Sequence, residues 1–132
     1  MQTFLPYPDF RQSARVLDRE RLGKQRVEAS QIIDTLEGRS KGWVNHPAVK
    51  MWEGYTDTLK HYCNCCIEEW SRRKYKNNME LYVISEIVTP WWLGKNLLHS
   101  SHRAALLYKN FDFYYTHYQW TEIPSLNYWW PV

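Results

Sequence analysis

The sequence predicts an all-α fold, built as a single compact domain over residues 1–132. Apolar side chains recur at helical spacing in residues 10–36 and 45–74, which predicts two long helices. A chain of 132 residues with 44% hydrophobic residues can bury a core, and it shows no internal repeat and no convincing linker. One or two shorter helices and an irregular aromatic C-terminal tail are expected to complete the domain.

The first long helix is expected over residues 10–36, because the two prolines of the preceding LPYP segment exclude a helix there. Asp9 or Ser13 would cap its N-terminus, and Gly38 would stop it. Gly23 lies inside the pattern and disfavours a helix by about 1 kcal/mol relative to alanine. A kink or a close packing contact is therefore predicted at Gly23.

The second long helix is the clearest in the chain, with Asn45 as the expected N-cap and Pro47 in the first turn. The KYKNN segment ends it. Its apolar positions repeat over about eight turns. They are Val49, Trp52, Leu59, Tyr62, Cys63, Cys66, Ile67 and Trp70.

The remaining chain gives weaker patterns. Residues 79–88 are ambiguous, and we favour a helix there. Another helix is expected to start at Asn96 or Ser100 and run through about Lys109, followed by a short helix within residues 110–120. The last ten residues form the aromatic tail.

Cys63, Cys65 and Cys66 are too close together for a normal disulfide framework, and neither a second pair nor a spaced histidine completes a zinc site. We therefore interpret them as buried apolar residues and predict no metal and no cofactor. The N-terminus resembles no signal peptide, and no stretch approaches the roughly 20 apolar residues of a membrane span. These features predict a soluble intracellular protein, cytoplasmic or DNA-associated, without membrane contact.

The net charge of +3 is mild, but basic residues cluster in residues 11–26 and 72–76. Two such patches on a small domain are typical of phosphate binding, although solvated helix faces have the same composition. Abundant Asn, Lys and Tyr would suit an AT-rich genome, which leaves a viral source open.

Polar residues fall on both faces of the first helix. At about 100° per residue, Arg15, Arg19 and Arg26 form one outer stripe. Four others point into the apolar arc, where unpaired burial would cost several kcal/mol. They form either a structural ion-pair network or a polar site with a catalytic carboxylate. These four are Asp18, Arg21, Gln25 and Glu28.

A second polar cluster is expected in HSSHR, where His99 and Arg103 lie one turn apart beside His102. It follows the PWWLG loop, which contains Trp92. His46 follows the GWVN loop and is expected near the polar site of the first helix.

Several segments, MQTFLPYPDF, RLGKQRVE, NHPAVKMWEG, PWWLG and SSHRAALL, together resemble a bacterial branch related to the pyrimidine-dimer DNA glycosylase family. The resemblance to that branch covers nearly the whole chain, whereas resemblance to the phage enzyme of the family ends at about Arg73. It implies a helical DNA-repair glycosylase and abasic-site lyase that acts on double-stranded, damaged DNA. The family's catalytic carboxylate falls on Glu28.

The family's nucleophile is an N-terminal α-amine, which attacks sugar C1′, forms a Schiff base and leads to strand cleavage by β-elimination. Gln2 is bulky and leaves Met1 in place, so Met1 is the implied nucleophile. An α-amine has an ordinary pKa of roughly 7.7–8.0, which leaves a useful neutral fraction at physiological pH.

From the residues and the resemblance together we predict three sets of contacts. The catalytic pair is Met1 and Glu28. The expected substrate-binding residues are Arg21, Lys24, Gln25, Arg26, His46, Trp92, His99, His102 and Arg103, and the expected DNA-backbone contacts are Arg15, Arg19, Arg72 and Arg73.

Two other functions stay open at this point. One is a non-catalytic DNA-binding protein on the same scaffold, which would use the arginines and the aromatic loops. The other is an aromatic-rich protein-interaction module, and a homodimer is also open.

Overall fold

The computed structural model describes residues 1–132 and consists of six helices without strands, which confirms the all-α class. None of these helices is both long and apolar enough to cross a membrane. The helices are α1 (Phe10–Val16), α2 (Arg19–Leu36), α3 (Pro47–Lys50), α4 (Thr56–Arg72), α5 (Asn96–Lys109) and α6 (Phe111–Tyr118).

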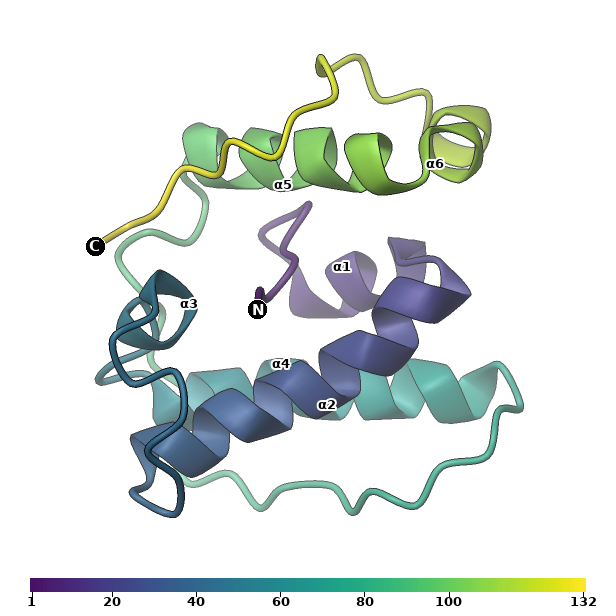
Figure 1. The fold of residues 1–132 in the computed structure, drawn as a ribbon. Helices are drawn as coiled ribbons and strands as arrows, with labels where there is room; N and C mark the ends of the chain where they lie inside the picture. The colour runs from purple at the N-terminus through teal and green to yellow at the C-terminus, as the bar shows by residue number, and fades with distance from the viewer.

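The helices form two groups (Figure 1). In the first, α1 and α2 both pack on α4, and α3 contacts α2. In the second, α5 packs against α6, and the C-terminal tail runs along α5. The N-terminal arm, residues 1–6, passes between the two groups (Figure 1). The expected α5, the short α6 and the irregular tail are confirmed.

The prediction of one continuous helix over residues 10–36 is wrong, because Leu17 and Asp18 are extended and separate α1 from α2. The break comes from a distant residue, Tyr114 of α6. Its hydroxyl accepts the backbone N–H of Asp18 at 3.0 Å and donates to the Asp18 carboxylate. The predicted cap is confirmed at Asp9, which accepts the Gln12 N–H at 2.8 Å.

Gly23 marks the predicted close packing contact inside α2. A Cβ atom at this position would lie 3.1 Å from the ring of Trp70 on α4. The Arg26 guanidinium, one turn further along α2, stacks 4.4 Å above the same ring. The absence of a side chain at Gly23 therefore lets α2 approach α4 closely.

The second long helix is also interrupted, contrary to the prediction. α3 ends at Lys50, and α4 starts at Thr56 after a turn in which Gly54 has a φ of +83°. This left-handed conformation favours glycine and does not continue a helix. The N-cap is His46 rather than Asn45, and its Nδ1 accepts the Ala48 N–H at 3.0 Å.

Residues 79–88 contain no helix, which corrects our sequence interpretation. They run irregularly along α4, whose polar side chains bind their backbone. The Asn64 side chain binds both N and O of Tyr82, and the Thr58 hydroxyl does the same for Val88. Side-chain partners thus replace the hydrogen bonds that a helix would have made internally.

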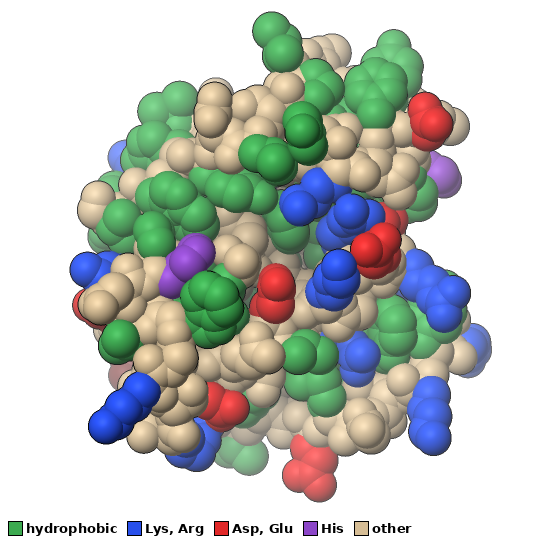
Figure 2. Space-filling model, in the orientation of Figure 1, with side chains coloured by type: hydrophobic (Ala, Val, Ile, Leu, Met, Phe, Trp, Pro, Cys, Tyr) green, Lys and Arg blue, Asp and Glu red, His purple; other side chains and the backbone are tan.

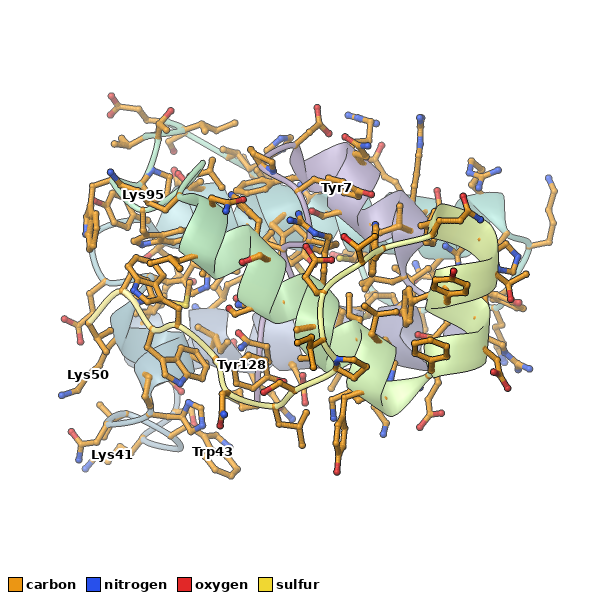
Figure 3. The ribbon with its side chains drawn as sticks, turned by 90° about the horizontal axis from the view of Figure 1, so that it is seen from above. Tyr7, Lys41, Trp43, Lys50, Lys95 and Tyr128 are labelled. Carbon is orange, nitrogen blue, oxygen red and sulfur yellow. The ribbon has the colours of Figure 1, made fainter.

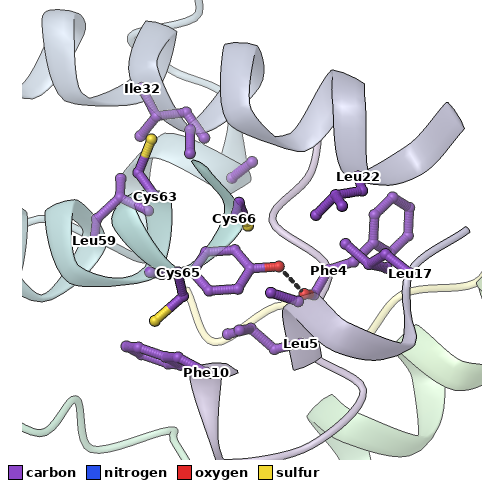
Figure 4. Close-up of a cluster of buried hydrophobic side chains, with 14 of the residues drawn as sticks. Phe4, Leu5, Phe10, Leu17, Leu22, Ile32, Leu59, Cys63, Cys65 and Cys66 are labelled. Carbon is purple, nitrogen blue, oxygen red and sulfur yellow. Dashed lines mark hydrogen bonds between the residues drawn. The ribbon is translucent and has the colours of Figure 1, made fainter. Parts of the chain in front are cut away.

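The three cysteines are free and buried in the core between α4 and its neighbours, as predicted (Figure 4). Burial raises the pKa of the Cys63 thiol to about 12 and that of Cys65 to about 11. All three therefore stay protonated and unreactive in the folded protein.

The N-terminal arm is part of this core. Thr3 and Leu5 are fully buried, and Phe4 is nearly so. The Tyr62 hydroxyl of α4 donates to the Phe4 carbonyl (Figure 4), and the Trp52 indole donates to the Thr3 hydroxyl at 3.0 Å. The fold therefore fixes the path of the chain that leads to Met1.

Candidate active site

A cavity of about 180 Å³ opens where the arm begins. It brings together Met1 and Glu28, the two residues that we predicted as the catalytic pair. Both are half-buried, so each is held by the protein and still accessible. The other lining residues are Gln2, Phe4, Arg21, Lys24, Lys109 and Tyr128.

Three parts of the chain build this cavity together with the arm. α2 contributes Arg21, Lys24 and Glu28, which share one face because they lie about one turn apart. Lys109 ends α5, and Tyr128 comes from the C-terminal tail. Tyr128 lies on the same side of the molecule as Trp43 in Figure 3.

The charge in the cavity is predominantly positive. Arg21 binds Asp18 at 3.1 Å, and Lys24 binds Glu20 at 3.2 Å, whereas Lys109 has no ion pair. On the face where the N-terminus lies, basic side chains gather to one side and hydrophobic ones to the other (Figure 2). Such an arrangement attracts an anionic group next to an apolar surface.

Tyr128 faces Glu28 across the cavity. Burial raises the pKa of Tyr128 to about 12, and the negative charge of Glu28 adds to the effect. The Tyr128 ring packs edge-on against Phe4 and His102, with centroids 6.4 Å and 5.8 Å away. The tail thus covers the arm and closes one wall of the cavity.

His46 lies near the N-terminal amine without lining the cavity. Burial, and after it the positive charge of the amine, lowers the pKa of His46. Its ring contacts Trp43 and Trp130 edge-on, each at 5.8 Å. His46 and these two indoles form an aromatic rim beside Met1.

Gln25 does not line the cavity but holds the arm behind it. The side chain is 1% exposed, accepts the Phe4 N–H at 2.7 Å and donates to the Gln2 carbonyl at 2.9 Å. Gln2 is itself buried. Met1 precedes these anchored residues and lines the cavity.

The expected cluster around HSSHR is assembled, but it lies under the arm instead of in the cavity. His99 and His102 are buried and bind the backbone of Leu5, and Arg103 donates to the Pro6 carbonyl at 2.7 Å. Trp92 is fully buried, and its indole donates to the Met51 carbonyl.

The predicted arginine stripe is not continuous, because the break at Asp18 places Arg15 and Arg19 on different helices. Both side chains are exposed. Arg26 lies on Trp70, away from the cavity, and donates to Asn77. The other two expected backbone contacts, Arg72 and Arg73, both bind the Glu69 carboxylate at 2.7 Å.

Sequence reasoning missed two residues of the first cavity, Lys109 and Tyr128, since neither belongs to a motif.

A second cavity, of about 250 Å³, lies between Asp9, Arg11 and His61 and contains neither Met1 nor Glu28.

Because His102 is buried in its neutral form, we expect acid to destabilise the protein. Burial lowers the pKa of His102 to about 3, so the folded state keeps this ring neutral, while the unfolded chain takes up a proton below about pH 6.5. The contribution of His102 to the free energy of unfolding is therefore fully present above about pH 6.5, and it is lost as the pH falls toward 3. Urea unfolding is expected to give about 2 kcal/mol less stability at pH 5 than at pH 7.

Burial also lowers the pKa of His46 and His99, which acts in the same direction. The carboxyls with lowered pKa, such as Glu69, lose their contribution only at lower pH. Equal stability at pH 5 and pH 7 would contradict the expectation.

Residues 1–83 match the family described as pyrimidine dimer DNA glycosylase. A search of curated proteins and a search of solved structures each gave no significant match. The matched part contains Met1, the arm, and α2 with Glu28. Because this match covers more than half of the chain, the protein belongs to the pyrimidine dimer DNA glycosylase family.

Proposed function

We propose that the protein is a DNA glycosylase and abasic-site lyase that acts on damaged double-stranded DNA. The Met1 α-amine is the nucleophile, and Glu28 is the acid and base. The observation that carries the proposal is the shared cavity, which both Met1 and Glu28 line at the start of a buried arm.

The chemistry begins at the sugar of the damaged nucleotide. The nitrogen lone pair of Met1 forms a bond to C1′, the glycosidic bond breaks, and its electron pair leaves with the base, which takes up a proton. The sugar ring opens at the C1′–O4′ bond to give a protonated Schiff base, with the amine proton lost and O4′ protonated. Removal of a C2′ proton then expels the 3′ phosphate oxygen by β-elimination.

Glu28 suits the proton transfers of this sequence and the stabilisation of the cation. A carboxylate beside a developing iminium stabilises its positive charge and accepts protons within reach. The cavity is below the roughly 300–1,000 Å³ of sites for drug-sized ligands. The cavity therefore suits one sugar unit, while the rest of the duplex stays outside it.

The basic side chains at the cavity supply the attraction for DNA. Lys109 is unpaired, and Lys24 is largely exposed despite its ion pair. Phosphates flanking the reacting sugar are the natural partners for such cations. A damaged nucleotide also costs less to unstack, which favours its entry into the site.

Borohydride trapping tests the proposal. Wild-type protein is expected to form a covalent adduct with duplex DNA containing a pyrimidine dimer or an abasic site. Glu28→Gln should lower the rate of adduct formation by about 10² to 10⁴-fold, because an amide cannot transfer the protons. Glu53→Gln, which removes an exposed carboxylate on another segment, should trap at the wild-type rate.

Absence of any adduct with either DNA would overturn the enzymatic proposal. Salt-dependent binding without an adduct would instead favour a non-catalytic DNA-binding protein.

A further inference from the structure

The arm is held from two sides, and the second side comes from the part of the chain outside the family match. α2 and α4 bind residues 2–4 through Gln25 and Tyr62. α5 binds the next two residues, Leu5 and Pro6. Residues 84–132, which contain α5, are not covered by the match.

Three residues of α5 make these contacts, and we call them the α5 clamp: His99, His102 and Arg103. Their spacing of three and four residues places them on one helix face, toward the arm. His102 Nδ1 accepts the Leu5 N–H at 2.9 Å. His99 Nδ1 lies 2.7 Å from the Leu5 carbonyl oxygen.

The contacts fix the protonation of both rings. His99 Nε2 accepts the Gly94 N–H at 2.9 Å, so the proton of the neutral ring is on Nδ1, which donates to the Leu5 carbonyl. His102 has the opposite tautomer, because its Nδ1 is already an acceptor. The two rings therefore satisfy both backbone groups of Leu5, which is fully buried.

We propose that the α5 clamp positions the Met1 amine: His99, His102 and Arg103 set the register of the arm, and thereby the distance between the amine and Glu28. Leu5 lies four residues from Met1, and the segment between them is buried and belongs to no helix. A shift of Leu5 along the arm axis is therefore transmitted to the amine. This inference rests on the proposed function, and it gives His99, His102 and Arg103 a role in catalysis without contact with DNA.

Single-turnover trapping on abasic duplex tests the clamp. His102→Leu removes the acceptor for Leu5, and Arg103→Met removes the donor to Pro6. Both should lower the rate of adduct formation at least tenfold while the Kd for the duplex stays within twofold. His102→Asn places an amide oxygen close to the lost Nδ1 and should recover most of the rate, whereas His117→Leu, at an exposed position of α6, should match wild type.

Arg103 is only partly buried, so its variant tests the clamp even where His102→Leu does not fold. Folded variants that trap at the wild-type rate would overturn the proposal, as would equal losses in rate and affinity. Hydrogen exchange of the Leu5 amide distinguishes a failure of the clamp proposal from a failure of the proposed function. Even without an adduct, slow exchange in wild type and fast exchange in Arg103→Met support the clamp, and unchanged exchange refutes it.

Discussion

Addition of Gly-Ser in front of Met1 is expected to abolish covalent trapping of DNA, with a loss of at least about 10³-fold. Each added residue can lengthen the chain by roughly 3.3–3.6 Å, so the new terminal amine lies outside the cavity or blocks it. The former Met1 amine becomes an amide, which has no nucleophilic lone pair. The rate of borohydride-trapped adduct on abasic duplex measures the effect.

The same two residues added after Val132 provide the matched control, because this end of the chain is exposed. That variant should trap DNA at the wild-type rate. Full activity of the N-terminally extended protein would show that another amine is the nucleophile.

Replacement of Gln25 by Leu is expected to destabilise the protein by about 2–6 kcal/mol. The side chain satisfies two buried backbone groups of the arm, the N–H of Phe4 and the carbonyl of Gln2. Leucine has a similar volume but no polar atoms, so each group would lose its partner at a cost of about 1–3 kcal/mol. Urea unfolding at pH 7 measures the change.

Gln31→Leu is the control on the same helix, since Gln31 is exposed and its replacement should change stability by less than about 0.5 kcal/mol. Equal stability of the two variants would contradict a structural role of the arm. The Gln25 variant should also release the arm and slow DNA trapping, even where it remains folded.

The pattern of apolar residues predicted most of the helical content, but not where the helices break. The break at Asp18 depends on Tyr114, which lies 96 residues later in the sequence. Residues 79–88 are apolar enough for a helix, yet their backbone is bound by polar side chains of α4. Local periodicity contains no information about such distant partners.

The site was likewise predicted where local pattern determines it, and not where distant residues do. The helical register placed Glu28 and Arg21 inward, and the resemblance added Met1; all three line one cavity. His99 and His102 were predicted as substrate-binding residues because two histidines beside an arginine are typical of a polar site. Their partners are backbone groups 94 and 97 residues away, and no sequence pattern reveals these.

The most direct test of the proposed chemistry is to identify the protein atom that becomes bonded to DNA. After borohydride reduction, proteolysis and mass spectrometry should locate the sugar remnant on the α-nitrogen of Met1. Lys24 and Lys109 line the same cavity and carry amines that are also able to form a Schiff base. A remnant on either lysine, with Met1 unmodified, would contradict the assignment of Met1 as the nucleophile.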